Sequence, residues 1–388
     1  MRTEESRIIY AGGLHAQQID SSPERHFRML TKDSLMRWEL PDSLVKLQKM
    51  DDSGLQRALL QGVSRTFALT IPCLPAPLYE VVANAYLLCR IIDTIEDEVA
   101  LDSAQKYEFC HAFVQQALHS PAEAADFAER LASLLSSQTI PAEHCLIVNI
   151  PRVVAILHGF ERRQREALIA CVTTMAQGMP RFQLQNLRYG LDTLEDMDRY
   201  CYYVAGCVGE MLAKLFCDYA EDIAEHREQL LSLSVSFGQG LQMTNILKDI
   251  WDDYERGVCW LPQEVFTRFG FNLVELSPAS SDEHFDRGLE YLINIAHGHL
   301  HNALSYILLI PKRHTGIRDF CLLALGMALL SLAKIKRNLD FKRSDQVKIS
   351  RTSVKAVIAV TKITHRHDSA LKFLFKGLEK SILTPSRH

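Results

Sequence analysis

The spacing of apolar residues constrains the fold more than any other feature of this 388-residue sequence. From Asp51 onward, apolar side chains recur every three or four positions, which places them on one face of an α-helix, and almost no segment alternates with the period of two typical of β-strands. Proline-containing breaks separate the helical segments, at Ile71 to Pro75, Ile140-Pro141, Met179-Pro180 and Ser277-Pro278. The pattern predicts an all-α fold, a single-domain bundle of about ten or more helices.

Composition divides the chain into three parts. Residues 1–50 mix proline, serine and charge with weak periodicity, and we expect an arm on the surface. Residues 51–365 form the predicted helical domain, and residues 366–388 a basic amphipathic tail. The whole chain carries a charge of −4, but residues 334–388 hold 14 Lys and Arg against 4 Asp and Glu. An acidic body with a basic end argues against a general nucleic-acid binder and leaves phosphates or an anionic membrane as partners of the tail.

The cysteines and the N-terminus indicate a cytoplasmic protein. Ten cysteines are scattered without a C-x-x-C pair, as in proteins whose thiols stay reduced. Residues 1–7 are polar, and no apolar run follows that would make a secretory signal. The longest apolar stretch, Phe320 to Ala333, is 14 residues, shorter than the roughly 20 that cross a bilayer. We therefore expect no membrane span.

Two acidic motifs interrupt otherwise apolar helices. Asp93 and Asp97 are four residues apart, and so are Asp249 and Asp253. Residues with this spacing share one helix face, so each pair places two like charges side by side. Such a pair becomes favourable when a divalent cation lies between the carboxylates, and Mg²⁺ prefers one or two carboxylates together with substrate phosphates.

Each acidic pair continues a polar stripe along its helix. Tyr86 and Arg90 precede the first pair, and Gln242 and Asn245 precede the second. A single pair of this kind is usually a solvated helix face. Two pairs on helices with apolar opposite faces instead predict an internal cavity, where metal ions assist the departure of a diphosphate.

A third informative stretch runs from Tyr200 to Gly209. Tyr200, Tyr203 or Val204, and Cys207 fall on one helix face, and the glycines allow close helix approach or a local kink. Such aromatic clusters are most often part of a core. In a cavity that holds a carbocation, tyrosine rings would stabilise positive charge and a phenol would move a proton.

Together these segments resemble the squalene and phytoene synthase family, in order and spacing, from about residue 50 to 265. The resemblance rests on four stretches: Ser64 to Phe67, Leu88 to Asp97, Tyr200 to Gly209, and Leu241 to Pro262. It implies an α-helical isoprenoid synthase fold around a central apolar cavity. It also implies a head-to-head condensation of two prenyl diphosphates.

The resemblance assigns roles to individual residues. Asp93 and Asp97 would hold Mg²⁺ on one diphosphate, and Asp249 and Asp253 on the other. Tyr200, with Tyr203, would transfer a proton or stabilise a cation. The expected substrate-binding residues are Ser64, Arg65, Thr66, Phe67, Tyr86, Arg90, Gln242, Asn245 and Lys248.

The C-terminal third resembles the squalene-forming branch of the family. Phe320-Cys321 and the basic stretch Val347 to Arg351 resemble the C-terminal region of that branch, in which a Phe-Cys pair precedes a basic stretch. Phe320 would line the pocket of the second half-reaction. Lys348 would contact an anionic group of the cofactor or a substrate phosphate, and Arg351 and Asn245 would contact NADPH or NADH. Plain alternatives are a core aromatic for Phe320 and a solvated charge for Lys348.

Two residues depart from the family pattern. Ser350 stands where squalene synthases usually carry a basic residue, and Lys248 replaces the usual arginine before Asp249. Lysine keeps the charge but loses the two-pronged hydrogen bonding of arginine. Ser350 concerns the predicted reductant site and Lys248 a contact with an anion. Neither departure changes the four carboxylates.

The expected reaction is therefore the condensation of two farnesyl diphosphates followed by reduction to squalene. Three alternatives remain: a dehydrosqualene or phytoene synthase without the reduction, a terpene cyclase acting on one diphosphate, and a non-catalytic helical assembly protein that keeps the fold. Residues 370–380 are amphipathic, basic and aromatic, so the tail either rests on the cytoplasmic face of a membrane or packs against the body. No dinucleotide-binding glycine motif is present.

Overall fold

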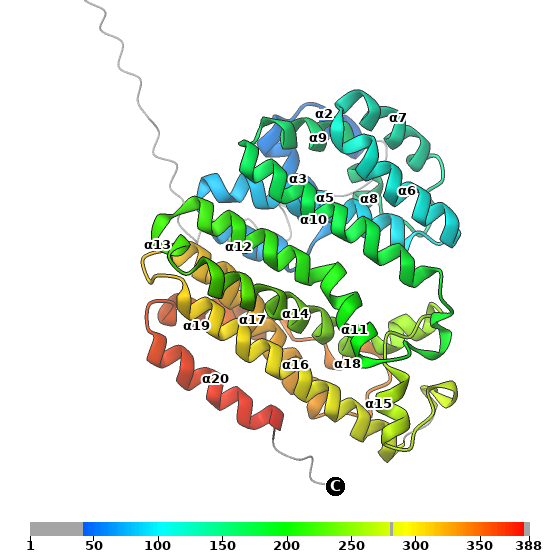
Figure 1. The fold of residues 1–388 in the computed structure, drawn as a ribbon, viewed down its shortest axis with the longest axis vertical. Helices are drawn as coiled ribbons and strands as arrows, with labels where there is room; N and C mark the ends of the chain where they lie inside the picture. Colours follow the sequence, from blue (N-terminus) through cyan, green and yellow to red (C-terminus); the bar gives the residue numbers. More distant parts are fainter. Residues whose placement is uncertain (1–41, 280–281, 384–388) are drawn as a thin grey trace, which may run out of the picture. The chain divides into compact units, whose positions relative to one another are not determined.

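The computed structural model describes residues 42–279 and 282–383, and they fall in one compact unit (Figure 1). Throughout these residues the regular structure is helical, and an isolated bridge between Leu191 and Pro262 is the sole β-type pairing described. The all-α prediction is confirmed. Most of the predicted N-terminal arm, residues 1–41, lies outside the described residues.

The N-terminal helices form the upper layer of Figure 1. Their bounds are α2 (Asp42–Gln48), α3 (Asp52–Val63), α4 (Phe67–Thr70), α5 (Ala76–Asp97), α6 (Ser103–Gln115), α7 (Pro121–Ala132), α8 (Pro141–Val148), α9 (Ile150–Gly159) and α10 (Arg162–Gln183). Short 3₁₀ turns follow α4 and α6, namely η1 (Ile71–Cys73) and η2 (Ala117–His119). Helix α5 packs against α3, α8, α9 and α10, so it lies inside this layer.

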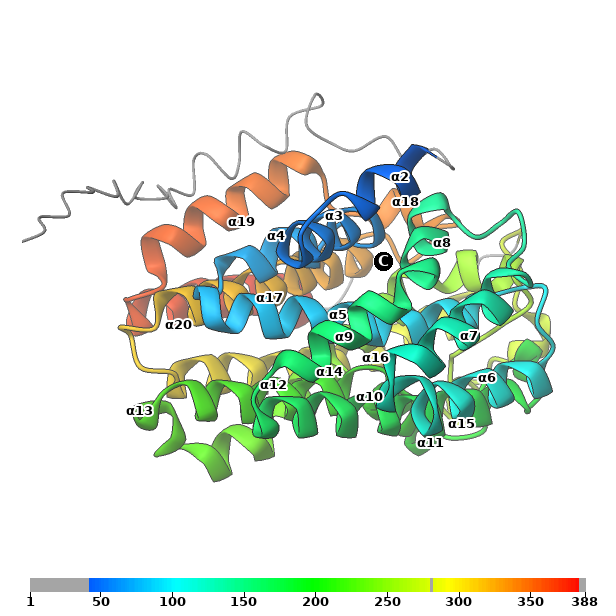
Figure 2. The ribbon, with the colours of Figure 1, turned by 90° about the horizontal axis from the view of Figure 1, so that it is seen from above.

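The second half of the chain supplies the longer helices. Their bounds are α11 (Leu194–Cys201), α12 (Cys207–Tyr219), α13 (Glu221–Ala224), α14 (Arg227–Glu255), α15 (Gln263–Arg268), α16 (Glu283–Leu309), α17 (Thr315–Lys336), α18 (Ser344–Val347), α19 (Arg351–Thr364) and α20 (Asp368–Leu383). A π-helical turn, η4 (Tyr202–Gly206), joins α11 to α12, and 3₁₀ turns η3 (Leu187–Tyr189) and η5 (Leu273–Glu275) lie in connections. Helix α14 packs against α12, α16 and α17, and α19 covers the far side of α17 (Figure 2).

Glycines let α14 approach η4 and α12 closely. A Cβ atom added to Gly238 would lie 2.1 Å from the carbonyl oxygen of Ala205, and one added to Gly209 would lie 2.2 Å from that of Ser234. Any larger residue would push the helices apart. Close helix approach in the Tyr200 to Gly209 stretch is confirmed at Gly209.

One predicted break is wrong. Helix α10 continues through Pro180 and ends only at Gln183. Proline removes one backbone donor, and here it does so in the last turn of the helix. The breaks at Ile71 to Pro75, Ile140-Pro141 and Ser277-Pro278 all mark helix boundaries, as expected: the first contains the 3₁₀ turn η1, and Pro141 is the first residue of α8.

Helix α17 is buried within the bundle. It is the one helix in residues 42–279 and 282–383 that is long and apolar enough to cross a membrane, and 78% of its apolar window is buried in the protein. Buried charges anchor its start to the C-terminal helices: the fully buried Arg318 contacts Asp368 at 2.6 Å, and Asp319 contacts Lys362 at 2.5 Å. This helix therefore connects the interior of the domain to α19 and α20.

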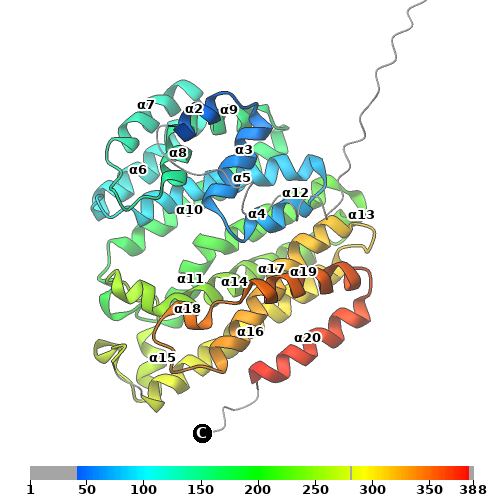
Figure 3. The same ribbon diagram turned by 180° about the vertical axis from the view of Figure 1, so that it is seen from behind.

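Helix α20, the core of the predicted tail, packs one face on the body (Figure 3). Leu371, Phe375 and Ile382 are buried, and the helix contacts α16 and α17. Its opposite face is exposed and carries Lys372, Phe373 and Lys376. The prediction that the tail packs against the body is therefore confirmed for the buried face of α20, and membrane contact stays a prediction.

Candidate active site

One large cavity lies between α5, α12, α14 and α17, with a volume of about 1130 Å³. Roughly 300 to 1000 Å³ is usual for a pocket that holds one drug-sized ligand. Both acidic motifs line it, and the remaining lining includes Met175, Met211, Phe216 and Phe237. The cavity therefore combines a carboxylate-rich part with a large apolar part.

The first acidic motif ends α5. The side chain of Asp93 is 28% exposed and lies 3.6 Å from the guanidinium of Arg90. Burial, opposed by Arg90, raises the pKa of Asp93 to about 6. Arg90 also forms an ion pair with Glu143 of α8, so it is held between two carboxylates.

Glu96 occupies the same motif but faces the interior. Its carboxylate accepts a hydrogen bond from Gln183 of α10 at 3.1 Å, and it lines the cavity. Burial and the neighbouring Asp97 raise its pKa to about 8, so the side chain is protonated at neutral pH.

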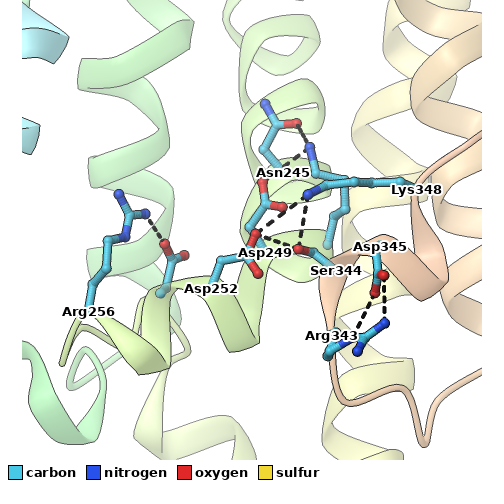
Figure 4. Close-up of polar contacts among 10 residues, drawn as sticks. Asn245, Asp249, Asp252, Arg256, Arg343, Ser344, Asp345 and Lys348 are labelled. Carbon is cyan, nitrogen blue, oxygen red and sulfur yellow. Dashed lines mark hydrogen bonds and ion pairs between the residues drawn. The ribbon is translucent and has the colours of Figure 1, made fainter. Parts of the chain in front are cut away.

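The second acidic motif lies near the end of α14 (Figure 4). The ammonium of Lys248 lies 3.2 Å from Asp249 and donates a hydrogen bond to the Asn245 side-chain oxygen at 3.0 Å. Gln242 lines the cavity one turn earlier on α14. Lys248 thus neutralises Asp249 from the same helix.

Asp253 and Asp97 meet at one guanidinium. Arg256, the residue that caps α14, forms an ion pair with Asp253 and lies 3.3 Å from Asp97 of α5. The Asp253 side chain is 9% exposed, and burial raises its pKa to about 6. The ends of the two acidic motifs therefore lie close to each other, as the two-motif prediction requires.

Asp252 connects the second motif to the C-terminal region. It accepts a hydrogen bond from Ser344 of α18 and lies 3.6 Å from the ammonium of Lys348 (Figure 4). Lys348 also donates to the Ser344 hydroxyl at 3.2 Å and lines the cavity. Lys348 is therefore held beside the carboxylates.

The carboxylates fit a metal that is shared with its substrate. Across residues 42–279 and 282–383, no three His, Cys, Asp or Glu side chains converge to hold an ion by themselves. Mg²⁺ commonly takes one or two carboxylates and completes its shell with phosphate oxygens and water. Asp93, Asp97, Asp249 and Asp253 all line the cavity, so the donor set suits Mg²⁺ carried in with a diphosphate.

Tyr200 lies against Trp260 in the cavity wall. Their rings stack with centroids 3.7 Å apart, and Phe182 meets Tyr200 edge-on at 5.3 Å. Burial, together with Glu96 and Asp97, holds the pKa of Tyr200 well above its usual range. The phenol is therefore neutral, and Tyr200 and Trp260 together form an aromatic part of the cavity lining.

Tyr203 does not line the cavity. Its ring packs on α10, where a Cβ added to Gly178 would lie 2.0 Å from it. The π-helical turn η4 contains this residue and shifts the cavity-facing register, so Val204, Ala205 and Val208 line the cavity after Tyr200. Of the two candidates for this face, Val204 is the one that lines it.

The apolar part of the cavity includes Phe320. Its ring meets Phe216 of α12 edge-on at 6.2 Å, and both line the cavity with Tyr306 and Cys321. Phe67 and Tyr86 line it from α4 and α5, with ring centroids 5.2 Å apart.

Besides Tyr203, four predicted site residues lie outside the lining. Arg65 and Thr66 are exposed, and Arg351 is exposed at the start of α19. The Ser64 hydroxyl accepts a hydrogen bond from the backbone of Phe67 at 2.9 Å, so it stabilises the turn before α4. These residues do not meet the carboxylates in this conformation.

The sequence did not identify several residues that contact the site but lie outside the predicted motifs. Glu143 and Trp260 come from segments with no polar stripe, and no local pattern marks them. Asp252 and Arg256 stand next to the second motif, and their charges could have identified them. Residues 252–256 contain three carboxylates and one arginine, which is more charge than a solvent-exposed helix end requires.

The family model for squalene/phytoene synthase matches residues 60–353. The squalene synthase of Cyberlindnera jadinii is 27% identical over 288 residues, 72% of this chain and 61% of that protein, and that of Bos taurus is 25% identical over 315 residues, 79% and 70%. The match thus spans less than two thirds of the length of the yeast relative.

Solved structures share the fold. A structure of TcSQS with the ligand E5700 superposes with a TM-score of 0.66 at 22% identity, covering 86% of this chain and 91% of the other. A dehydrosqualene synthase structure gives 0.57 at 22% identity, covering 85% and 99%. The family comprises head-to-head prenyl synthases, which act on prenyl diphosphates and use Mg²⁺. With three quarters of its length matching the family model, and with both acidic motifs lining one cavity, the chain belongs to the squalene/phytoene synthase family.

Proposed function

We propose that this protein is a squalene synthase. It would join two farnesyl diphosphates head to head into presqualene diphosphate and reduce that intermediate with NADPH to squalene. The observation that carries the proposal is the single cavity of about 1130 Å³, in which two Asp pairs from different helices adjoin a large apolar space. Two farnesyl diphosphates would need both parts: the Asp pairs for their diphosphates and the apolar space for their long chains.

The carboxylate part of the cavity would bind both diphosphates. When bound, Mg²⁺ would neutralise the diphosphate oxygens and make them better leaving groups. Asp93 and Asp97 would hold it for one substrate, and Asp249 and Asp253 for the other. Arg90 lies beside Asp93 and Lys248 beside Asp249. Together with Lys348, which lines the same cavity, they would contact the remaining oxygens.

The first half-reaction breaks the C1–O bond of one farnesyl diphosphate. The C2=C3 double bond of the second attacks the resulting allylic cation, and loss of a proton closes a cyclopropane. Because Tyr200 is a neutral phenol, it would relay that proton to a departing diphosphate and would not act as the resting base. The stacked rings of Tyr200 and Trp260 would stabilise the positive charge.

The second half-reaction breaks the remaining C1–O bond, rearranges the cyclopropane and adds a hydride. NADPH, when bound, would supply that hydride, so that two farnesyl diphosphates, NADPH and a proton give squalene, two diphosphates and NADP⁺. Lys348, held by Asp252 and Ser344, would contact an anionic group of the reductant. Phe320 and its apolar neighbours would exclude water, which would otherwise capture the cation.

The deciding experiment incubates the purified protein with Mg²⁺ and farnesyl diphosphate, with and without NADPH. We expect squalene with NADPH, and presqualene diphosphate without it. Formation of dehydrosqualene regardless of NADPH, or of phytoene from a C20 diphosphate, would replace the proposal with the non-reducing branch. No turnover of any prenyl diphosphate would favour a non-catalytic protein of this fold.

We also propose that the exposed face of α20 rests on the cytoplasmic face of an anionic membrane, close to where an insoluble product must go. Phe373 is 78% exposed and stands between Lys372 and Lys376. An exposed aromatic ring flanked by lysines suits a lipid interface. Phe373→Ala with Lys376→Glu should abolish co-sedimentation with vesicles containing phosphatidylserine, whereas equal sedimentation of variant and parent would reject the contact.

A further inference from the structure

Arg256 joins the two acidic motifs. Its guanidinium pairs with Asp253 through one nitrogen and lies 3.3 Å from Asp97 through another. Asp97 ends α5 and Asp253 lies near the end of α14, so this side chain bridges the two helices that carry the proposed metal ligands. Figure 4 shows Arg256 and Lys348 on opposite sides of the end of α14.

The position of Arg256 suits a residue that can move. The side chain is 55% exposed, and Asp97 is 52% exposed, whereas Asp253 is only 9% exposed. Arg256 follows the last residue of α14 and precedes Gly257, whose φ of 77° places it in the left-handed region that favours glycine. The guanidinium therefore reaches a buried carboxylate from a solvent-accessible helix end.

The surrounding charges explain why a cation is needed there. Asp97 and Asp253 reach the same guanidinium, so their two like charges lie close together and repel each other. Removing carboxylates from water without a counter-charge is costly. Arg256 supplies that charge to Asp97 and Asp253, two of the oxygen donors that a divalent ion would use.

We propose that Arg256 is an internal counter-ion that competes with a divalent cation for Asp97 and Asp253, and that it turns to the diphosphate once the cation has displaced it. The inference rests on the proposed role of these two carboxylates in metal binding. One arginine would thus hold the two motifs together when no metal is bound, and would position the diphosphate when the metal is bound. It also favours arrival of the metal together with diphosphate, because the anion then offers the guanidinium a new partner.

The test uses the full-length protein, Mn²⁺ and inorganic pyrophosphate, without any turnover. Free Mn²⁺ is measured by electron paramagnetic resonance for the parent, for Arg256→Gln and for Arg256→Lys. With Mn²⁺ alone, Arg256→Gln should bind roughly three- to tenfold more tightly than the parent, since a half-exposed competing pair is worth only a small factor. Pyrophosphate binding in the presence of Mn²⁺ should weaken by a similar factor.

The opposite signs of these two effects distinguish the proposal from a general loss of structure. Arg343→Gln is the matched control, because Arg343 pairs only with the exposed Asp345, at 2.7 Å, among the ion pairs described. It should leave both affinities unchanged. Adding Asp97→Asn to Arg256→Gln should remove the gain in Mn²⁺ affinity, which locates the gain at this carboxylate.

Two results would overturn the inference. Mn²⁺ affinity equal to or weaker than that of the parent in Arg256→Gln would show that the arginine does not compete. Unchanged pyrophosphate binding would show that it does not turn to the diphosphate. Neither result depends on the product formed, so failure of the proposed squalene synthesis would be seen separately, in the product assay of the parent.

Discussion

The two acidic motifs have the same spacing in the sequence but different surroundings in the structure. The first, on α5, is held by residues of other helices: Arg90 is shared with Glu143 of α8, and Glu96 bonds to Gln183 of α10. The second, on α14, is neutralised by residues close to it in the chain, Lys248 and Arg256. It also holds the segment that carries Lys348.

This difference indicates that the two motifs have different roles in the proposed reaction. The first motif is built into the N-terminal layer, so its geometry depends on core packing. The second motif is tied through Asp252 and Ser344 to the region that we expect to bind the reductant. Changes at the first motif should therefore affect ionisation alone, whereas changes around the second should also affect reduction.

The largest expected effect comes from removing one carboxylate of each motif. Asp93→Asn and Asp249→Asn should each lower kcat by roughly 10²- to 10³-fold, the usual cost of losing a group that stabilises developing charge. Turnover of farnesyl diphosphate in the presence of Mg²⁺ measures this. Asp345→Asn, an exposed aspartate near the second motif, is the control. Full activity in either motif variant would remove that motif from metal binding.

The next effect is the pH dependence of metal binding. Burial raises the pKa of Asp93 and of Asp253 to about 6, so both bind a proton more readily than in the unfolded chain. Their contribution to folding stability is therefore present below about pH 4 and is lost as the pH rises through 6. Conversely, Mg²⁺ affinity should fall about tenfold from pH 7 to pH 5 for each carboxylate that must lose a proton.

Thermal shift titrations with Mg²⁺ at pH 5, 6 and 7 would measure this dependence. Asp93→Asn should remove the pH dependence of Mg²⁺ affinity that comes from the first motif and leave the dependence that comes from the second. An affinity that stays constant across this range would mean that neither carboxylate is protonated near pH 6.

A smaller effect should separate the two half-reactions. Lys348→Ala should lower squalene formation roughly tenfold, the order expected for a charge-assisted contact, while presqualene diphosphate forms at nearly the parental rate. Asp252→Asn should act in the same direction more weakly, because Lys348 keeps its bond to Ser344. Product analysis by mass spectrometry resolves both steps. An equal loss of both products would show that Lys348 serves the first step.

The smallest effect should come from the interior partner of the first motif. Glu143→Gln removes a charge that holds Arg90 and should cost about 1 kcal/mol of folding stability, with a few-fold rise in KM for farnesyl diphosphate. Urea unfolding and steady-state kinetics measure the two. A change in the share of presqualene diphosphate would contradict the separation between the motifs.

Much of the fold was predictable because the apolar period is a local property of the chain. Proline breaks such as Ile140-Pro141 follow from the missing backbone donor and the fixed φ of proline. Pro180 was mispredicted because its place in the last turn of α10 depends on where that helix ends. Spacing alone predicted the two carboxylate pairs, the resemblance assigned each pair to one diphosphate, and all four carboxylates line the cavity.

Positions that depend on the exact helix register were less predictable. Tyr203 and Val204 are adjacent in the sequence, and the π-helical turn decides which of them lines the cavity. Ser64, Arg65 and Thr66 lie at a turn, where helical spacing gives no direction for a side chain. A motif can identify such residues but cannot orient them.

The sequence by itself determined the helical class, the two carboxylate pairs and the acidic body with a basic end, because spacing and charge are properties of the chain alone. Only the tertiary structure decided that Arg256 bridges Asp97 and Asp253, that Glu143 holds Arg90, and that Asp252 anchors the Lys348 segment. These contacts join residues from 53 to 159 positions apart, or depend on where a helix ends. Packing, which sums over the whole core, is what brings such residues together.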